Sequence, residues 1–202
     1  MKQSIILLVI TGLIQVNAIA ATEDRWARSY TYESKEEYQK AAALIRPVLG
    51  SAKQSEFASL RYAWLSYRNK KYDTSIRYYK RALQINRDSI DARLGLLLPL
   101  MAKKRWKDVK KQSKAVLKID PYNYPAHVRL MMSEEAEMDW NKLSKHAGQL
   151  TKRYPANLEP WLYLARAEAW KAKRGLAIEA YEKVLMISPR NLEAKRYISG
   201  SD

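Results

Sequence analysis

Apolar side chains recur at helical spacing between residues 103 and 119, and basic side chains fill the positions between them. Trp106, Val109 and Val116 belong to one stripe, because residues three, four and seven positions apart share a face of an α-helix. This pattern predicts an amphipathic helix over about 105–119 with its charged side chains turned outward.

Capping residues and helix breakers divide the rest of the chain into segments of similar length. Ser55, Ser89 and Asp139 suit the position before a helix, where a side chain accepts a hydrogen bond from the first turn, and Pro125 suits that first turn. These signals predict helices over about 55–69, 73–85, 90–102, 105–119, 125–137, 140–153, 158–171, 174–187 and 192–198. The chain is therefore predicted to be all-α.

Two series of residues repeat along the chain with a period of 34. One series is Pro121, Pro155 and Pro189; the other is Tyr72, Trp106 and Trp140. A fixed period of this length indicates a repeat array, in which neighbouring units stack because none buries its apolar face alone.

The last copy of the unit carries the clearest motif. It reads Trp161, Leu164, Ala165, then Ala177, Tyr181, Leu185 and Pro189. This pattern resembles the tetratricopeptide repeat, a helix–turn–helix module, and four copies fit in register at about 56–89, 90–123, 124–157 and 158–191. The resemblance implies a right-handed solenoid of about four repeats, with a helical cap at each end, over 34–202.

The residues before the first copy continue the pattern in part. Tyr38 lies one period before Tyr72, Ser34 with Glu37 fits a capping box, and Pro47 is expected to bend or shorten a helix. Half a unit is therefore expected here. Residues 22–33 are either a degenerate first helix or a loose arm.

The first residues of the chain are typical of a cleavable signal peptide over 1–21. Lys2 precedes an apolar run over 5–14, and Ala18 and Ala20 follow at the small-x-small spacing of a cleavage site. An uncleaved membrane span is the alternative, but the run is well short of the ~20 residues that a span needs. No transmembrane segment is expected after signal removal. The chain has no cysteine, which suits an oxidising compartment, so a periplasmic or secreted location is expected.

Side-chain size differs where the two helices of each unit are expected to cross. The first and fourth copies place small residues there, such as Ala63 and Ala165, whereas the third places Met131, Leu143 and Leu150. Because the distance between helices follows the residues at their contact, the helices of the second and third repeats are expected to lie further apart.

Tetratricopeptide repeat proteins usually bind peptides on the concave face, which the first helix of each pair lines. The matching positions are mostly apolar or aromatic: Phe57, Leu60, Trp64, Tyr67, Arg68, Leu98, Met101, Met132, Arg166 and Trp170. Such a surface favours an apolar segment of a partner protein. The alternative is that several positions on these helices are core, as expected for Leu94, Val128 and Leu162. A clamp for a terminal carboxylate is not expected, since Arg166 is the only charged residue at the clamp positions.

Charge gives a second hypothesis. The net charge is +16, and the densest run is Lys103, Lys104, Arg105, Lys107, Lys110, Lys111, Lys114 and Lys118. Such a field attracts polyanions, so the run is either a solvated face or a binding surface for an anionic glycan or lipid. Nucleic acid is disfavoured by the predicted signal peptide.

Catalysis and metal binding have little support in the sequence. His127 and His146 lie apart; His127 occupies a position that suits core packing, and His146 is expected on a helix surface. Glu134, Glu135, Glu137 and Asp139 form an acidic cluster that is interpreted as a solvated loop rather than a metal site. No enzyme activity, metal or cofactor is expected. The sequence thus predicts an exported scaffold or adaptor for a protein partner, and the resemblance to tetratricopeptide repeat proteins implies an envelope or exopolysaccharide secretion assembly as its setting.

Overall fold

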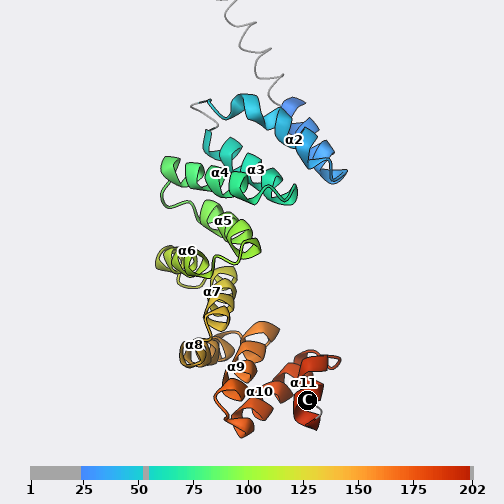
Figure 1. Cartoon of the computed structure of the whole chain (residues 1–202), viewed down its shortest axis with the longest axis vertical. Helices are drawn as coiled ribbons and strands as arrows, with labels where there is room; N and C mark the ends of the chain where they lie inside the picture. The colour runs from blue at the N-terminus through green and yellow to red at the C-terminus, as the bar shows by residue number, and fades with distance from the viewer. Residues whose placement is uncertain (1–23, 52–54, 201–202) are drawn as a thin grey trace, which may run out of the picture. The chain divides into compact units, whose positions relative to one another are not determined.

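The computed structural model describes residues 24–51 and 55–200, and within these ranges the secondary structure is helical, without strands (Figure 1). The signal peptide predicted for residues 1–21 lies outside the described residues. None of the described helices is both long and apolar enough to cross a membrane. The predicted all-α helix–turn–helix fold is confirmed.

Short turns join the helices, and within each of the two compact units described below consecutive helices pack against one another. A helix over 24–34 precedes α2, and the others are α2 (Tyr38–Ile45), α3 (Ser55–Arg68), α4 (Tyr72–Ile85), α5 (Ile90–Ala102), α6 (Trp106–Ile119), α7 (Tyr124–Ala136), α8 (Trp140–Arg153), α9 (Leu158–Trp170), α10 (Arg174–Ile187) and α11 (Leu192–Ser199). These bounds agree with the predicted ranges to within about two residues, because caps and turns set them locally.

The N-terminal pair differs in detail from the expectation. Pro47 lies in a 3-10 helix over Arg46–Val48, which ends α2 early, as a proline that lacks an N–H donor should. The predicted capping box is absent: Ser34 Oγ donates to the carbonyl of Thr31, and Glu37 precedes α2 without a side-chain cap. Residues 24–34 and α2 thus form a shortened pair before the four predicted repeats.

The turns inside the pairs share one strained residue. Glu36, Lys70, Lys104, Met138 and Ala172 have φ of 54° to 59°, and they stand one period apart. In most of these turns the amide that follows the strained residue bonds back to the end of the first helix, as Lys71 does to the carbonyl of Ser66 at 2.8 Å. None of the five is glycine, so each turn carries the cost of an L-residue in the left-handed region.

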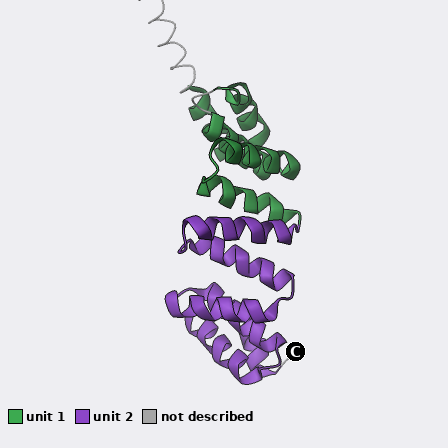
Figure 2. Ribbon diagram, turned by 90° about the vertical axis from the view of Figure 1, so that its left-hand side faces the viewer, with its two compact units in different colours: residues 1–103 green, residues 104–202 purple. Residues whose placement is uncertain are grey.

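The chain forms two compact units, divided between Lys103 and Lys104 (Figure 2). In the first, Ala41, Ile45 and Leu49 from the N-terminal pair are buried against Ala58 and Leu65 of α3. Aromatic side chains, Trp26 and Tyr38 among them, pack around this core. The helix over 24–34 is thereby held against α3.

The second unit holds α6 to α11 and contains two buried clusters. One surrounds Met131, Leu143 and Leu150, and the other surrounds Ala165 and Val184. The backbones of α9 and α10 run close together along much of their length, whereas α7 and α8 approach closely over a short stretch only. The wider spacing predicted for the third repeat is confirmed, since bulky side chains fill its crossing.

Candidate functional site

In the first unit, a partly buried carboxylate organises the face of α3. Glu33 accepts hydrogen bonds from the indole nitrogen of Trp64 and from the guanidinium of Arg61. The Arg61 side chain is only 6% exposed, and it also donates to Ser29 Oγ at 3.2 Å. Burial pushes the pKa of Glu33 up, but the bonds from Trp64 and Arg61 outweigh this and hold the pKa below its ordinary value.

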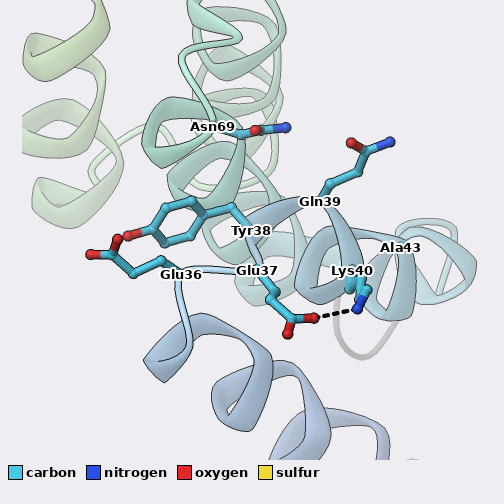
Figure 3. A pocket seen from close by; sticks show the side chains of 7 residues that line it. All are labelled: Glu36, Glu37, Tyr38, Gln39, Lys40, Ala43 and Asn69. Carbon is cyan, nitrogen blue, oxygen red and sulfur yellow. Dashed lines mark ion pairs between the residues drawn. The ribbon is translucent and has the colours of Figure 1, made fainter.

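Arg68 covers the edge of the same face. Its guanidinium lies 4.6 Å from the ring centre of Tyr38 and 5.4 Å from that of Trp64, and it donates to the Tyr38 hydroxyl. Tyr38 lines an open hollow of about 550 Å³ beside Glu36 and the Glu37–Lys40 ion pair (Figure 3). The guanidinium of Arg68 thus covers part of the exposed aromatic surface of Tyr38 and Trp64.

A smaller hollow in this unit lies beside α3, and we call it the first hollow. It has a volume of about 280 Å³ and is lined by Phe57, Leu60, Arg61, Trp64, Tyr79 and Asp91. Phe57 is 52% exposed although its ring centre lies 5.0 Å from that of Trp26. Three of the ten predicted groove residues therefore line one hollow.

In the second unit, Arg166 of α9 joins two carboxylates from neighbouring helices. Its Nε and Nη2 donate to the two oxygens of Glu193 at 2.7 Å and 2.6 Å, and its Nη1 donates to Glu135 at 3.1 Å. The Tyr181 hydroxyl also donates to Glu193, at 2.8 Å. Burial raises the pKa of Glu193, but the hydrogen bonds from Arg166 and Tyr181 outweigh it and leave the pKa below its ordinary value.

These side chains line a hollow of about 430 Å³, the second hollow below. Its lining is Glu135, Arg166, Ala169, Trp170, Tyr181, Glu193 and Tyr197. Trp170 ends α9 and is 69% exposed. Its ring stacks on that of Trp140, with centres 5.1 Å apart and planes 4° apart. One face of Trp170 is therefore fixed against the protein while the side chain stays open to solvent.

The two hollows share three lining positions of the repeat, which are Trp64 with Arg166, Tyr79 with Tyr181 and Asp91 with Glu193. Glu33 and Glu135, Trp64 and Arg166, and Asp91 and Glu193 are each separated by three periods of 34 residues. The glutamate of one first helix accepts from the next first helix in both units, from an indole in the first and a guanidinium in the second.

The other predicted groove residues lie outside these hollows. Tyr67, Leu98 and Met101 are half-buried on α3 and α5, and Met132 packs against the buried cluster of α7 and α8. Val128 and Leu162 also pack against buried clusters, as expected for core positions. Sequence reasoning missed Glu33 and Glu193 and interpreted Glu135 as part of a solvated loop, although the spacing of these residues by whole periods from other acidic residues was visible.

The basic run is less uniform than its sequence suggests. Lys103 pairs with Asp73 at 2.5 Å in the first unit, Arg105 pairs with Asp108 at 2.6 Å, and Lys110 pairs with Glu137. The remaining members are exposed: Lys104, Lys107, Lys111, Lys114 and Lys118. Of these, the last four fall on one stripe of α6 by helical spacing.

The two histidines, which the sequence separates, meet in the third repeat. His127 Nδ1 lies 2.9 Å from His146 Nε2, and His146 Nδ1 lies 3.0 Å from a carboxylate oxygen of Glu134. The expectation that His146 is a surface residue is wrong, since its side chain is only 13% exposed. Burial is the main cause that lowers the pKa of His127.

The predicted acidic cluster is divided among separate partners. Glu134 contacts His146, Glu135 contacts Arg166, and Glu137 contacts Lys110. Asp139 caps α8 and pairs with Lys142. Within the described ranges, no group of three or more histidine, aspartate or glutamate side chains is arranged to hold a metal ion.

No family model and no curated protein sequence matches this chain. Solved structures match it closely in fold at low identity. YrrB, "a TPR protein with an unusual peptide-binding site", is 15% identical with a TM-score of 0.74, over 87% of this chain and 90% of that one. MamA from Desulfovibrio magneticus RS-1 is 13% identical with a TM-score of 0.76, over 85% of this chain and 97% of that one.

A tetratricopeptide repeat protein from Parabacteroides merdae is 10% identical with a TM-score of 0.80, over 90% of this chain and 72% of that one. Matches at this level of identity establish the fold. The chain therefore has the tetratricopeptide repeat fold, as its sequence motif predicts.

Proposed function

We propose that this protein is a scaffold that binds a segment of a partner protein at the hollows on its first helices. The observation that carries the proposal is the second hollow, where Trp170 is 69% exposed at the mouth of a 430 Å³ space with fixed polar groups. Aromatic side chains with one face held in place are the usual anchors of protein interfaces. The peptide-binding site of YrrB supports the same interpretation by analogy of fold.

The chemistry of this face suits recognition better than catalysis. Glu33 is occupied by an indole and a guanidinium, and Glu193 by a guanidinium and a phenol. Carboxylates held in this way stay ionised and keep a fixed position. They present a preorganised surface rather than a base that exchanges protons with a substrate.

Binding of a captured partner tests this proposal. Phe57→Ala and Trp170→Ala should each weaken binding by about 2 kcal/mol, as expected for central aromatic anchors. Met186→Ala is the matched control, since Met186 is 73% exposed on α10 and lines neither hollow. Circular dichroism reports whether helical content is kept. Unchanged affinity in both variants, with folding intact, would refute the proposal.

We also propose an exported location, on the ground of the apolar run over 5–14 and the small residues Ala18 and Ala20. An envelope or exopolysaccharide secretion assembly fits such a scaffold. N-terminal sequencing of the protein from an envelope fraction tests the location, with a mature start at Ala21 or Thr22 as the expected result. A start at Met1 in a membrane fraction contradicts it.

A second candidate function rests on the lysine stripe of α6. Lys107, Lys111, Lys114 and Lys118 are exposed on one side of this helix, which favours an anionic glycan or lipid surface. Such binding should weaken steeply as salt rises, because exposed charges are screened. Sedimentation with anionic and neutral vesicles across a salt series, repeated with K107E and K114E, separates this function from peptide binding at the hollows.

A further inference from the structure

The cation that lines the second hollow, Arg166, is already paired within the protein. All three donor nitrogens of its side chain are engaged, two by Glu193 and one by Glu135. A carboxylate that entered the hollow would find every guanidinium nitrogen bonded to a carboxylate and would face two like charges. Arg166, the one charged residue that the sequence places at the clamp positions, is therefore a structural bridge.

The fixed charges of the hollow add up to an excess of one carboxylate. Glu135 and Glu193 are both ion-paired to the single guanidinium of Arg166, and Glu135 gives it only one oxygen, Oε1. The side chain of Glu135 is still 30% exposed. This local excess of negative charge selects for a ligand group of positive charge at short range, although the net charge of the chain is +16.

An aromatic face completes the site. Trp170 is stacked on Trp140 on one side, and at 69% exposure it is open on the other. Tyr197 and Tyr181, whose ring centres are 4.8 Å apart, also line the hollow. A guanidinium stacks well on an indole and at the same time donates to a carboxylate at its edge.

We propose that the second hollow binds an arginine side chain of the partner segment, with the guanidinium between Trp170 and Glu135. This proposal deepens the proposed function, because it names the chemistry of the partner at this site. Lysine fits less well, since its compact ammonium is more strongly hydrated and lacks a planar face. A terminal carboxylate or an acidic side chain is repelled.

Short glycine–serine peptides with blocked ends test the proposal directly. They carry arginine, lysine, norleucine or glutamate at the centre, and they are titrated into the 15N-labelled full chain. The indole N–H signal of Trp170 is followed and is identified by its loss in Trp170→Phe. The arginine peptide should shift this signal saturably, about three- to fivefold more tightly than the norleucine peptide, and the glutamate peptide should not bind.

Variants sharpen the result. Glu135→Gln keeps a hydrogen-bond acceptor for Arg166 but removes one charge, so it should weaken the arginine peptide severalfold and leave the norleucine peptide unchanged. Trp170→Ala should abolish binding, while Trp170→Phe should retain part of it; because both lack the indole signal, the backbone amide signals of Ala169 and Tyr197, which also line the hollow, report binding in these variants. Met186→Ala is the control. Equal affinity for norleucine and arginine, or tighter binding of glutamate, overturns the proposal.

The peptide titration is independent of any partner protein. If the captured partner binds through Trp170 but the arginine peptide shows no preference over norleucine, the proposed scaffold function stands and the arginine assignment is wrong. If the arginine peptide binds as expected while partner capture is insensitive to both hollows, the site exists and the scaffold function fails.

Discussion

At one position of the repeat, the first unit covers an aromatic ring with its own cation, whereas the second unit leaves an aromatic ring open to solvent. Arg68 lies over Tyr38 in the first unit, and Trp170 stacks on Trp140 in the second. The two pairs are separated by three periods of 34 residues, so they occupy one position of the repeat. Substitution at a constant position thus changes what the face can bind while the backbone pattern stays the same.

The same comparison holds one helix further along. Tyr79 in the first unit and Tyr181 in the second are repeat equivalents, as are Gly95 and Tyr197. A Cβ atom added to Gly95 would lie 2.3 Å from the Tyr79 ring, so this glycine makes room for the buried tyrosine. In the second unit Tyr197 is itself present, and the Tyr181 hydroxyl reaches Glu193 instead. The second hollow, of about 430 Å³, thus has Tyr197 and two carboxylates in its lining, whereas the first, of about 280 Å³, has Asp91 as its one carboxylate.

The largest expected effect is a loss of stability in the first unit when its buried arginine is replaced. Arg61→Met should lower its free energy of unfolding by about 3 kcal/mol, because Glu33 would keep its charge in a largely buried place without its main partner. Hydrogen exchange followed by mass spectrometry, segment by segment, measures this. Adding Glu33→Gln to Arg61→Met should recover most of the loss, and a loss that persists in the double variant would show that packing of Arg61, not the charge pair, matters.

Arg166→Met should destabilise the second unit less, by about 2 kcal/mol, since this pair is partly exposed. The loss should be greatest in α11, because Glu193 ties this helix to α9 through Arg166. Exchange protection over residues 192–199 is the measurement. If protection falls in α3 and α4 as much as in α11, the two bridges do not act within separate units.

The turn residues should behave alike in both units. Lys70→Gly and Ala172→Gly remove the strain of a left-handed L-residue and should each stabilise the protein by up to about 1 kcal/mol, after the entropic cost of glycine in the unfolded chain is subtracted. Urea unfolding of each variant tests this against Ala169→Gly, a substitution in the regular helix α9, which should destabilise. A gain in only one unit would show that the turns are not equivalent.

The smallest expected effect is a difference in acid sensitivity. The pKa of His127 in the folded protein is lowered, chiefly by burial. The contribution of His127 to the free energy of unfolding is therefore complete above the ordinary pKa of 6.5, and it is lost as pH falls from there through the lowered pKa. Glu33 and Glu193 have lowered pKa values as well, and their contributions are lost only below about 4.5. Both histidines of the chain lie in the second unit.

The second unit should therefore lose protection at a higher pH than the first. Hydrogen exchange between pH 7 and pH 5, corrected for the intrinsic pH dependence of exchange, measures the order. His127→Phe, which places an aromatic ring where Trp161 stands one period later, should remove the loss of protection between pH 7 and pH 5 in the second unit. A loss in this pH range that starts in α3 and α4 would contradict the assignment to His127.

Much of the fold could be predicted because its determinants are local or periodic. Ser89 caps α5, Asp139 caps α8 and Pro47 shortens α2 through bonds or clashes within a few residues, so their effects are readable in the chain. The 34-residue period by itself also places Trp64 and Arg166 on equivalent faces of their helices. The bulky crossing of the third repeat follows from its large apolar residues in the same way.

What each of these side chains does was decided by the tertiary structure alone. Arg166 became a bridge rather than a ligand anchor because α7 and α11 bring Glu135 and Glu193 to it from both sides. His146 joined Glu134 and His127, although spacing suggested a surface position, because its helix turns that side toward α7. The sequence by itself determined the helices, their ends and the repeat; only packing between helices decided which charges meet. The physical reason is that capping and periodicity act over one or two turns, whereas an ion pair depends on the distance and rotation between two helices and on the rotamers that their neighbours leave open.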